Sequence, residues 1–264
     1  MDPSPRHFPA LFVSHGAPTI AIENDGWTAA LEALGKELPR PRAVVIASAH
    51  WQTQGGVAVT GSARPETIHD FGGFPDALYA LRYPAPGDPA LARDIAQRLR
   101  ATGLSAEVDE QRGLDHGAWV PLMRLLPKAD VPALQLSLPM GGDPDVLLQI
   151  GKALAPLRDE GVLLVGSGGA THNLRRLRFG EREAAPMGYA SEFDRWLWER
   201  VQAGDVAALR GWRDAPSARA AHPTAEHLDP LFVVLGAAQP GETAYELHAE
   251  MLYGGLSMRS FVVR

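Results

Sequence analysis

Residues 43–51 read AVVIASAHW, an apolar run that ends on a histidine. Its first five residues are small or β-branched with no polar alternation, which is typical of a strand buried on both faces of a parallel sheet. His50 follows near the point where such a strand would end. Ligands of open α/β sheets bind outside the carboxyl ends of the strands. The stretch therefore predicts a parallel sheet with an ionisable ring at its functional edge.

Strand-like and helix-like segments alternate along the rest of the chain. The periodicity predicts strands within 9–16, 43–50, 55–62, 105–111 and 132–138, a strand followed by a glycine-rich turn within 162–173, and a final strand pair from 244–254 and 256–264. Helical spacing is found in 25–37, 88–103, 115–127, 143–161, 191–205, 206–214 and 224–238. Gly, Pro and aromatic residues dominate 65–89, which predicts a long ordered loop with a short helix. We expect one α/β domain over residues 1–264, with a central, mainly parallel sheet flanked by helices.

The composition excludes several classes of function. The 264 residues are 45% hydrophobic and 21% charged, as in soluble globular proteins, and the net charge of −6 gives no attraction to nucleic acid or to an anionic membrane. No apolar run is long enough to cross a bilayer, and the N-terminus lacks a signal-peptide pattern, so we expect a cytoplasmic protein. Because the chain has no Cys, disulfides, thiolate nucleophiles and iron–sulfur clusters are excluded. A bound metal would need nitrogen or oxygen ligands.

Three predicted strands are each followed by a histidine. His15 follows ALFVS, His50 follows VVIASA, and His172 follows VLLVGSGGAT. Parallel strands bring their carboxyl ends to one edge, so these rings should meet there, and a helix over 224–238 could present His227 to the same edge. One histidine alone is more often structural than functional, but the repeated placement favours a His-rich metal site.

Two other motifs predict different chemistry. SGGATHN (167–173) could be a phosphate cradle, although it lacks the spacings of the known glycine-rich loops. Ser14 and Ser167 occupy strand-to-turn positions, as hydrolase nucleophiles do, but neither fits the G-x-S-x-G pattern.

Two polar pairs have both a structural and a functional interpretation. His69 and Asp70 stand beside aromatic residues in TIHDFGGFP (67–75), either as part of a structured loop or as polar contacts from a lid. Asp115 could simply cap the following helix, whereas His116 could hydrogen-bond to a substrate or to oxygen.

Taken together, the motifs resemble the class III extradiol ring-cleaving dioxygenases, most closely their 4,5-DOPA dioxygenase branch. The resemblance runs from about residue 10 to the C-terminus and is carried by SHGAP (14–18), SAHW (48–51), TIHDFGGFP (67–75), DHGAWVPL (115–122), THNLR (171–175) and PTAEHLDPL (223–231). It implies the fold of the family's catalytic subunit and a non-haem Fe(II) enzyme that opens a catechol ring with O2. It also implies that Zn(II) can occupy the site in purified protein.

The resemblance assigns metal ligands residue by residue. SHGAP places one at His15, SAHW another at His50, and PTAEHL the third at His227. The related protocatechuate enzymes use a glutamate as third ligand, so Glu226 is the alternative to His227.

The resemblance also implies two catalytic histidines. His172 would be the acid–base residue and is sometimes counted as a fourth metal ligand, and His116 would lie near the substrate. The chemistry suits a histidine, because a catechol hydroxyl must lose a proton and a proton must later be returned. An imidazole with an ordinary pKa of about 6.5 does both at neutral pH.

Two competing functions remain open at this point, namely a zinc-dependent hydrolase and a non-catalytic metal-binding protein on the same scaffold. The expected partners are a catecholic substrate and O2, with no nucleic acid or membrane, and a homo-oligomer is left open.

Overall fold

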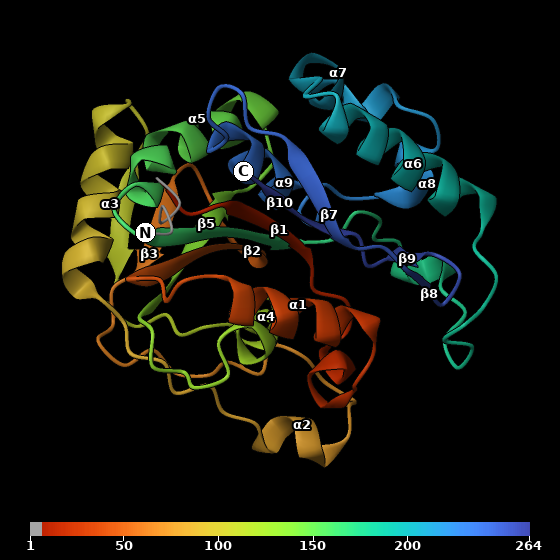
Figure 1. The fold of residues 1–264 in the computed structure, drawn as a ribbon, viewed down its shortest axis with the longest axis horizontal. Coiled ribbons are helices and arrows are strands. Elements are labelled where there is room, and N and C mark those ends of the chain that lie inside the picture. The colour runs from red at the N-terminus through yellow and green to blue at the C-terminus, as the bar shows by residue number, and fades with distance from the viewer. Residues whose placement is uncertain (1–6) are drawn as a thin grey trace.

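The strands that carry the predicted histidines lie side by side in one sheet. In the computed structural model, which describes residues 7–264, the sheet has the strand order β4-β3-β5-β2-β6-β1-β10-β7 (Figure 1). β2 pairs in parallel with β5 and β6, and β6 pairs in parallel with β1. The bounds are β1 Ala10–Ser14, β2 Ala43–Thr53, β3 Val57–Thr60, β4 Ala106–Asp109, β5 Ala133–Pro139, β6 Val162–Gly168, β7 Ala244–His248 and β10 Ser260–Val263. The predicted α/β fold with a mainly parallel central sheet is confirmed.

The C-terminal segment adds antiparallel strands at one edge of the sheet, and β3 also pairs antiparallel with β5. β10 lies between β1 and β7 and runs antiparallel to both, which confirms the predicted final strand pair. In the sequence between β7 and β10, β8 (Met251–Leu252) and β9 (Leu256–Ser257) form a separate two-stranded hairpin. This hairpin contributes to the site described below.

Helices cover both faces of the sheet. α1 and α4 pack on one face, while α3, α5 and α9 pack on the other, and α6 to α8 extend that second layer (Figure 1). Their bounds are α1 Gly26–Glu37, α2 Asp76–Ala80, α3 Pro89–Ala101, α4 His116–Leu125, α5 Pro144–Leu154, α6 Gly188–Gln202, α7 Val206–Arg210, α8 Ala218–Ala221 and α9 Asp229–Gly236. Because both faces are covered, the central strands are mostly apolar, and their polar residues Ser48, Gln135, Ser137 and Ser167 are buried.

Several helices begin at aspartates that the sequence places just before the apolar repeat. The Asp88 carboxylate accepts from the backbone N–H groups of Ala90 and Leu91, and Pro89 occupies the first turn. Asp115 accepts from the Ala118 N–H at the start of α4. Such caps satisfy N–H groups that have no partner within the helix, and each typically contributes about 1 kcal/mol.

Two predicted boundaries are wrong, and both affect histidines. The helix expected over 224–238 begins only at Asp229, because Pro230 is tolerated only in a first turn, so His227 lies in the turn before α9. The strand predicted over 43–50 continues to Thr53, with a shift in its pairing to β5 between Ala47 and Gln52. Both histidines still reach the carboxyl edge of the sheet.

Two expectations concern the chain as a whole. Within residues 7–264, no helix is long and apolar enough to cross a membrane. The prediction of a single domain covers residues 1–264, of which 1–6 lie outside the described residues.

Candidate active site

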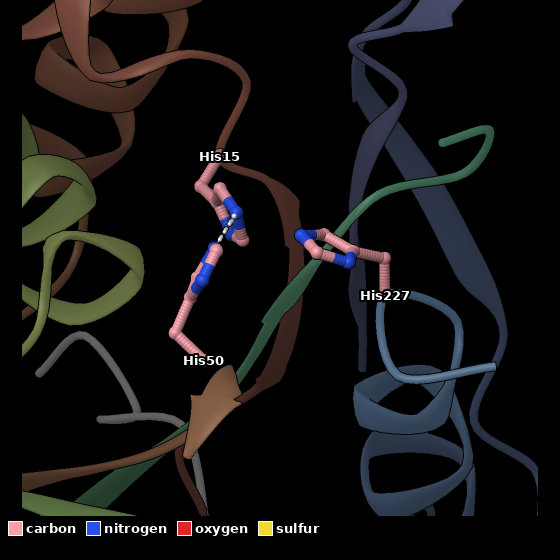
Figure 2. A group of neighbouring side chains, drawn as sticks. All are labelled: His15, His50 and His227. Atoms are coloured by element: carbon pink, nitrogen blue, oxygen red, sulfur yellow. Dashed lines mark hydrogen bonds between the residues drawn. The ribbon is translucent and has the colours of Figure 1, made fainter. Parts of the chain in front are cut away.

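Three histidines from distant parts of the chain converge at the carboxyl edge of the sheet. His15 follows β1, His50 lies in β2, and His227 lies in the turn before α9. One ring nitrogen of each lies within 4.8 Å of the others, and Figure 2 shows the rings turned toward a common point. The sequence-predicted trio is therefore brought together.

The ring of His15 is oriented by a serine of the neighbouring strand. Its Nδ1 lies 2.9 Å from the Ser167 hydroxyl, which donates its single proton to the Gly117 carbonyl at 2.5 Å. Ser167 must therefore accept from the His15 Nδ1–H. The Nε2 atom of His15 is left unprotonated and free to act as a ligand.

The other two rings are oriented by carboxylates. Nδ1 of His227 lies 3.2 Å from Glu226 Oε1, and Nδ1 of His50 lies 3.6 Å from Asp70 Oδ2. A carboxylate attracts the Nδ1 proton and leaves Nε2 with its lone pair. Nε2 of His227 is buried and has no hydrogen-bond partner among the residues that the structure describes.

These donors fit a metal ion. The Nε2 atoms of His15 and His50 lie 3.0 Å apart, which is unfavourable for two lone pairs unless a proton or a cation lies between them. Imidazole nitrogens bound to one ion are about 3 Å apart, since each is about 2.1 Å from the metal. Burial, followed by the neighbouring histidines, lowers the pKa of His15 well below its ordinary value, and burial with His116 lowers that of His50 to about 3. Neutral imidazole is the ligand form.

His116 stands beside this trio and is held by Asp70. Oδ1 of Asp70 accepts from the His116 backbone N–H at 2.9 Å and lies 3.0 Å from its Nδ1. Burial by itself would raise the pKa of Asp70, but the hydrogen bonds and charge of His116 lower it to about 2. The ring centroids of His116 and His50 are 4.0 Å apart. The ionised Asp70 thus fixes the ring of His116 next to the predicted ligands.

His172 lies on the opposite side of the site, stacked on His227. Their ring centroids are 3.3 Å apart and the planes differ by 8°. The His172 backbone N–H donates to the Ala221 carbonyl at 2.9 Å, which fixes the turn that carries it. Burial lowers the pKa of His172 to about 4. Potential ligand atoms of His172, Glu226 and His227 lie within 4.8 Å of one another and form a second group, which shares His227 with the trio of His15, His50 and His227. This arrangement favours His227 over Glu226 as third ligand, because Glu226 lies at the Nδ1 side of His227.

The structure contradicts the phosphate-cradle and serine-nucleophile interpretations. The backbone N–H of Gly169 is taken by the His227 carbonyl and that of His172 by Ala221, so the glycine-rich turn presents no row of free donors. The hydroxyl of Ser14 donates to the Arg259 carbonyl at 2.7 Å, and that of Ser167 donates to Gly117. Neither hydroxyl proton is directed at a base, because each is donated to a backbone carbonyl and Ser167 accepts from His15.

The five histidines line a cavity of about 340 Å³. The aromatic loop contributes Phe71 and Phe74 to the cavity wall, while Asp70 of that loop supports His116. Tyr253 and Leu256 of the β8–β9 hairpin also line the cavity. No sequence pattern predicted their presence there. The supporting role of Ser167 was likewise missed, since it depends on the register of β6 beside β1.

Comparison with known proteins shows the family to which this chain belongs. Residues 6–260 match the family model described as the catalytic LigB subunit of aromatic ring-opening dioxygenase. The chain belongs to the LigB family. The family confirms the expected class III extradiol resemblance and an enzyme that opens aromatic rings by dioxygenation, with a small-molecule substrate.

Relatives of this LigB-family chain are similar over nearly their whole length. The 4,5-DOPA dioxygenase extradiol of Escherichia coli K12 is 40% identical over 261 residues, covering 97% of this chain and 95% of the relative. The protein of the same name from Beta vulgaris is 40% identical over 257 residues, covering 95% and 94%. The crystal structure of an uncharacterized Escherichia coli K12 protein matches with a TM-score of 0.84 and 34% identity, covering 97% of this chain and 100% of that one.

Proposed function

We propose that this LigB-family enzyme uses Fe(II), held by His15, His50 and His227, to cleave the ring of a substituted catechol with O2 beside the diol. The observation that carries the proposal is the convergence of three imidazoles within 4.8 Å, those of His15 and His227 buried and that of His50 half-buried. The Nδ1 atom of each ring faces a serine hydroxyl or a carboxylate. The names of the relatives support a catechol with a side chain, as in DOPA. Zn(II) suits the same nitrogen donors and is expected in protein purified without added iron.

Bound Fe(II) would supply open coordination positions for the catechol and O2 and pass electron density between them. The protein residues supply the proton transfers. A catechol hydroxyl must be deprotonated, and His172, with a pKa of about 4, is neutral at pH 7 and able to accept that proton. The imidazole of His172 can return this proton to the substrate when the catechol ring opens.

His116 has a different task. Its Nδ1 faces the ionised Asp70, so its Nε2 is the nitrogen available to a ligand in the cavity. We assign it to hydrogen bonding with the bound substrate rather than to metal ligation. Phe71 and Phe74 line the cavity beside it and would exclude water from the reacting ring.

The test begins with the metal content of the purified protein, followed by anaerobic reconstitution with Fe(II) and an oxygen electrode. A catechol panel should give stoichiometric O2 uptake and a yellow semialdehyde product. Absence of O2 uptake with every catechol would overturn the proposal. Ester or amide cleavage by the zinc form, unimproved by iron, would instead favour the hydrolase that the sequence left open.

A further inference from the structure

A second cavity adjoins the turn that carries His227. Its volume is about 740 Å³, and among residues 7–264 it shares no lining residue with the cavity of the histidines. His227 lines the histidine cavity, whereas the preceding Glu226 lines the second one. The walls of the second cavity come from the end of β2, the loop after β5, residues 212–222 and the turn before α9. It is therefore a separate place where a ligand could bind.

The wall of the second cavity contains a carboxylate without a partner. Asp229 is fully buried in the first turn of α9, and neither of its oxygens accepts a hydrogen bond from residues 7–264. Glu226, by contrast, accepts from the Thr224 hydroxyl at 2.8 Å and faces His227. Buried polar groups are nearly always paired, and a buried charge without a partner is unfavourable. We therefore expect the partner of Asp229 to come from outside the chain.

A neutral acceptor belongs to the same wall. His222 is buried, and its Nε2 lies 3.0 Å from the Ala170 carbonyl, so this nitrogen carries the ring proton. The Nδ1 atom of His222 therefore keeps a lone pair, and it has no partner within the described part of the chain. Asp229 and His222 thus hold acceptors that lack donors. An ammonium group, with three N–H donors and no acceptor, is complementary to such residues.

Two arginines give the exposed part of the second cavity the opposite charge. Arg213 and Arg219 both line it and are exposed. The Arg213 guanidinium lies 4.7 Å from the ring centroid of Trp212 and does not bond to Asp229, whose oxygens are unpaired. Burial raises the pKa of Asp229 to about 7, and the nearby charge of Arg213 opposes this shift. The cavity therefore combines a buried carboxylate with exposed guanidinium groups, which recognise carboxylates by paired hydrogen bonds.

We propose that the second cavity binds a free α-amino acid, with its ammonium group against Asp229 and its carboxylate at Arg213 and Arg219. Both charged groups of an α-amino acid are attached to one carbon atom, so a single cavity can hold both. A simple anion would meet the carboxylate of Asp229, and a simple cation would meet the two arginines. Met140, which is 59% exposed and lines the cavity, offers apolar surface to the ligand side chain. The inference does not depend on the proposed ring-cleaving reaction.

Calorimetry on the protein as purified tests this site with L-leucine at pH 8, above the pKa of Asp229. Two matched compounds each lack one charged group: 4-methylpentanoate has no ammonium group, and 3-methylbutylamine has no carboxylate. We expect one L-leucine per chain, and each missing group should weaken binding by about tenfold or more. If L-leucine does not bind, or if the three compounds bind equally well, the proposal is wrong.

Two substitutions locate the bound amino acid. Asp229→Asn removes the charge with little change in volume, and Arg219→Ala removes an exposed cation, so both variants should fold. Each should weaken L-leucine binding by about tenfold or more. Arg195→Ala, at an exposed position on α6 outside the cavity, is the matched control and should leave the affinity unchanged. Unchanged affinity in Asp229→Asn or in Arg219→Ala would place the amino acid elsewhere, such as on the metal, and overturn the proposal.

Oxygen uptake distinguishes a free amino acid from the amino-acid group of a substrate. Because the two cavities are separate, L-leucine should have the same effect on the reaction of L-DOPA as on that of 4-methylcatechol. Competitive inhibition with L-DOPA alone would mean that the amino-acid group of the substrate reaches the second cavity, and would overturn a site for a free amino acid. If no catechol supports O2 uptake, the proposed function fails while the calorimetric result stands.

Discussion

The imidazoles of His172 and His227 stack in parallel with their ring centroids 3.3 Å apart. The predicted acid–base residue is thus packed directly on a predicted metal ligand. Its own ring nitrogens belong to a second cluster rather than to the trio of His15, His50 and His227. The roles proposed for the two residues, proton transfer for His172 and metal binding for His227, can be tested by different substitutions.

His172→Ala should reduce kcat without removing the metal. Loss of a positioned acid–base group typically lowers the rate by about 10²- to 10⁴-fold. Because the ring is not one of the trio, we expect the iron content to stay near that of the unmodified enzyme. The measurements are iron per chain and kcat from O2 uptake. Iron loss in step with activity would instead make His172 a fourth ligand.

Glu226→Gln and His227→Ala should differ in metal binding. His227→Ala removes a ligand, so we expect no retained iron and no increase in Tm when Fe(II) or Zn(II) is added. Glu226→Gln removes only the carboxylate at Nδ1 of His227 and should weaken affinity by about 10- to 100-fold. Metal titration followed by thermal unfolding distinguishes them. Complete loss in Glu226→Gln with metal retained in His227→Ala would identify Glu226 as the third ligand.

Ser167→Ala should weaken metal binding although Ser167 is not a ligand. Without the hydroxyl, Nδ1 of His15 loses the acceptor that fixes its protonation and orientation, and affinity should fall by about 10- to 100-fold. Chelator competition measures the change. Ser137→Ala, which removes another buried hydroxyl that bonds to the Ala58 N–H, is the control and should retain full affinity. Equal losses in the two variants would point to a general effect on folding.

A buried ion pair far from the metal site should govern acid stability. The fully buried Arg158 pairs with Glu242, and also donates to the Phe8 and Ala237 carbonyls at 2.7 Å. Glu242→Gln leaves the guanidinium without its counter-charge and should lower the free energy of unfolding by about 3 kcal/mol at pH 7. Denaturant unfolding measures the difference.

The pH dependence of that difference follows from the pKa of Glu242. Burial opposes ionisation, but hydrogen bonds from Arg158 and the Gln239 N–H lower the pKa below its ordinary value. The pair therefore stabilises the fold fully above the unfolded pKa of about 4.3, and this contribution is lost as pH falls through the lower folded pKa. The unmodified protein and Glu242→Gln should converge in stability over that range. A constant difference down to pH 3 would contradict this account.

Much of the fold could be predicted from the sequence, because the relevant signals are local. Continuous apolar runs such as 43–47 indicate strands buried on both faces, and Asp88 before Pro89 indicates a helix start. Histidines after buried strands indicated the functional edge, a predicted helix was expected to bring His227 to it, and the resemblance assigned His227 as a metal ligand. The start of α9 was misjudged because apolar periodicity continues across the turn that holds His227, and only Pro230 limits the helix.

The sequence by itself determined which residue types reach the edge of the sheet, and the tertiary structure alone decided how they meet there. The roles of the histidines stay predictions, but their geometry depends on contacts across large separations. Ser167 reaches His15 only because β6 lies beside β1, and Asp70 reaches His116 only because its loop folds over α4. The wall of the cavity is likewise completed by Tyr253 and Leu256 of the β8–β9 hairpin. Hydrophobic periodicity reports the burial of each segment, whereas the strand order and the packing of loops decide which side chains become neighbours.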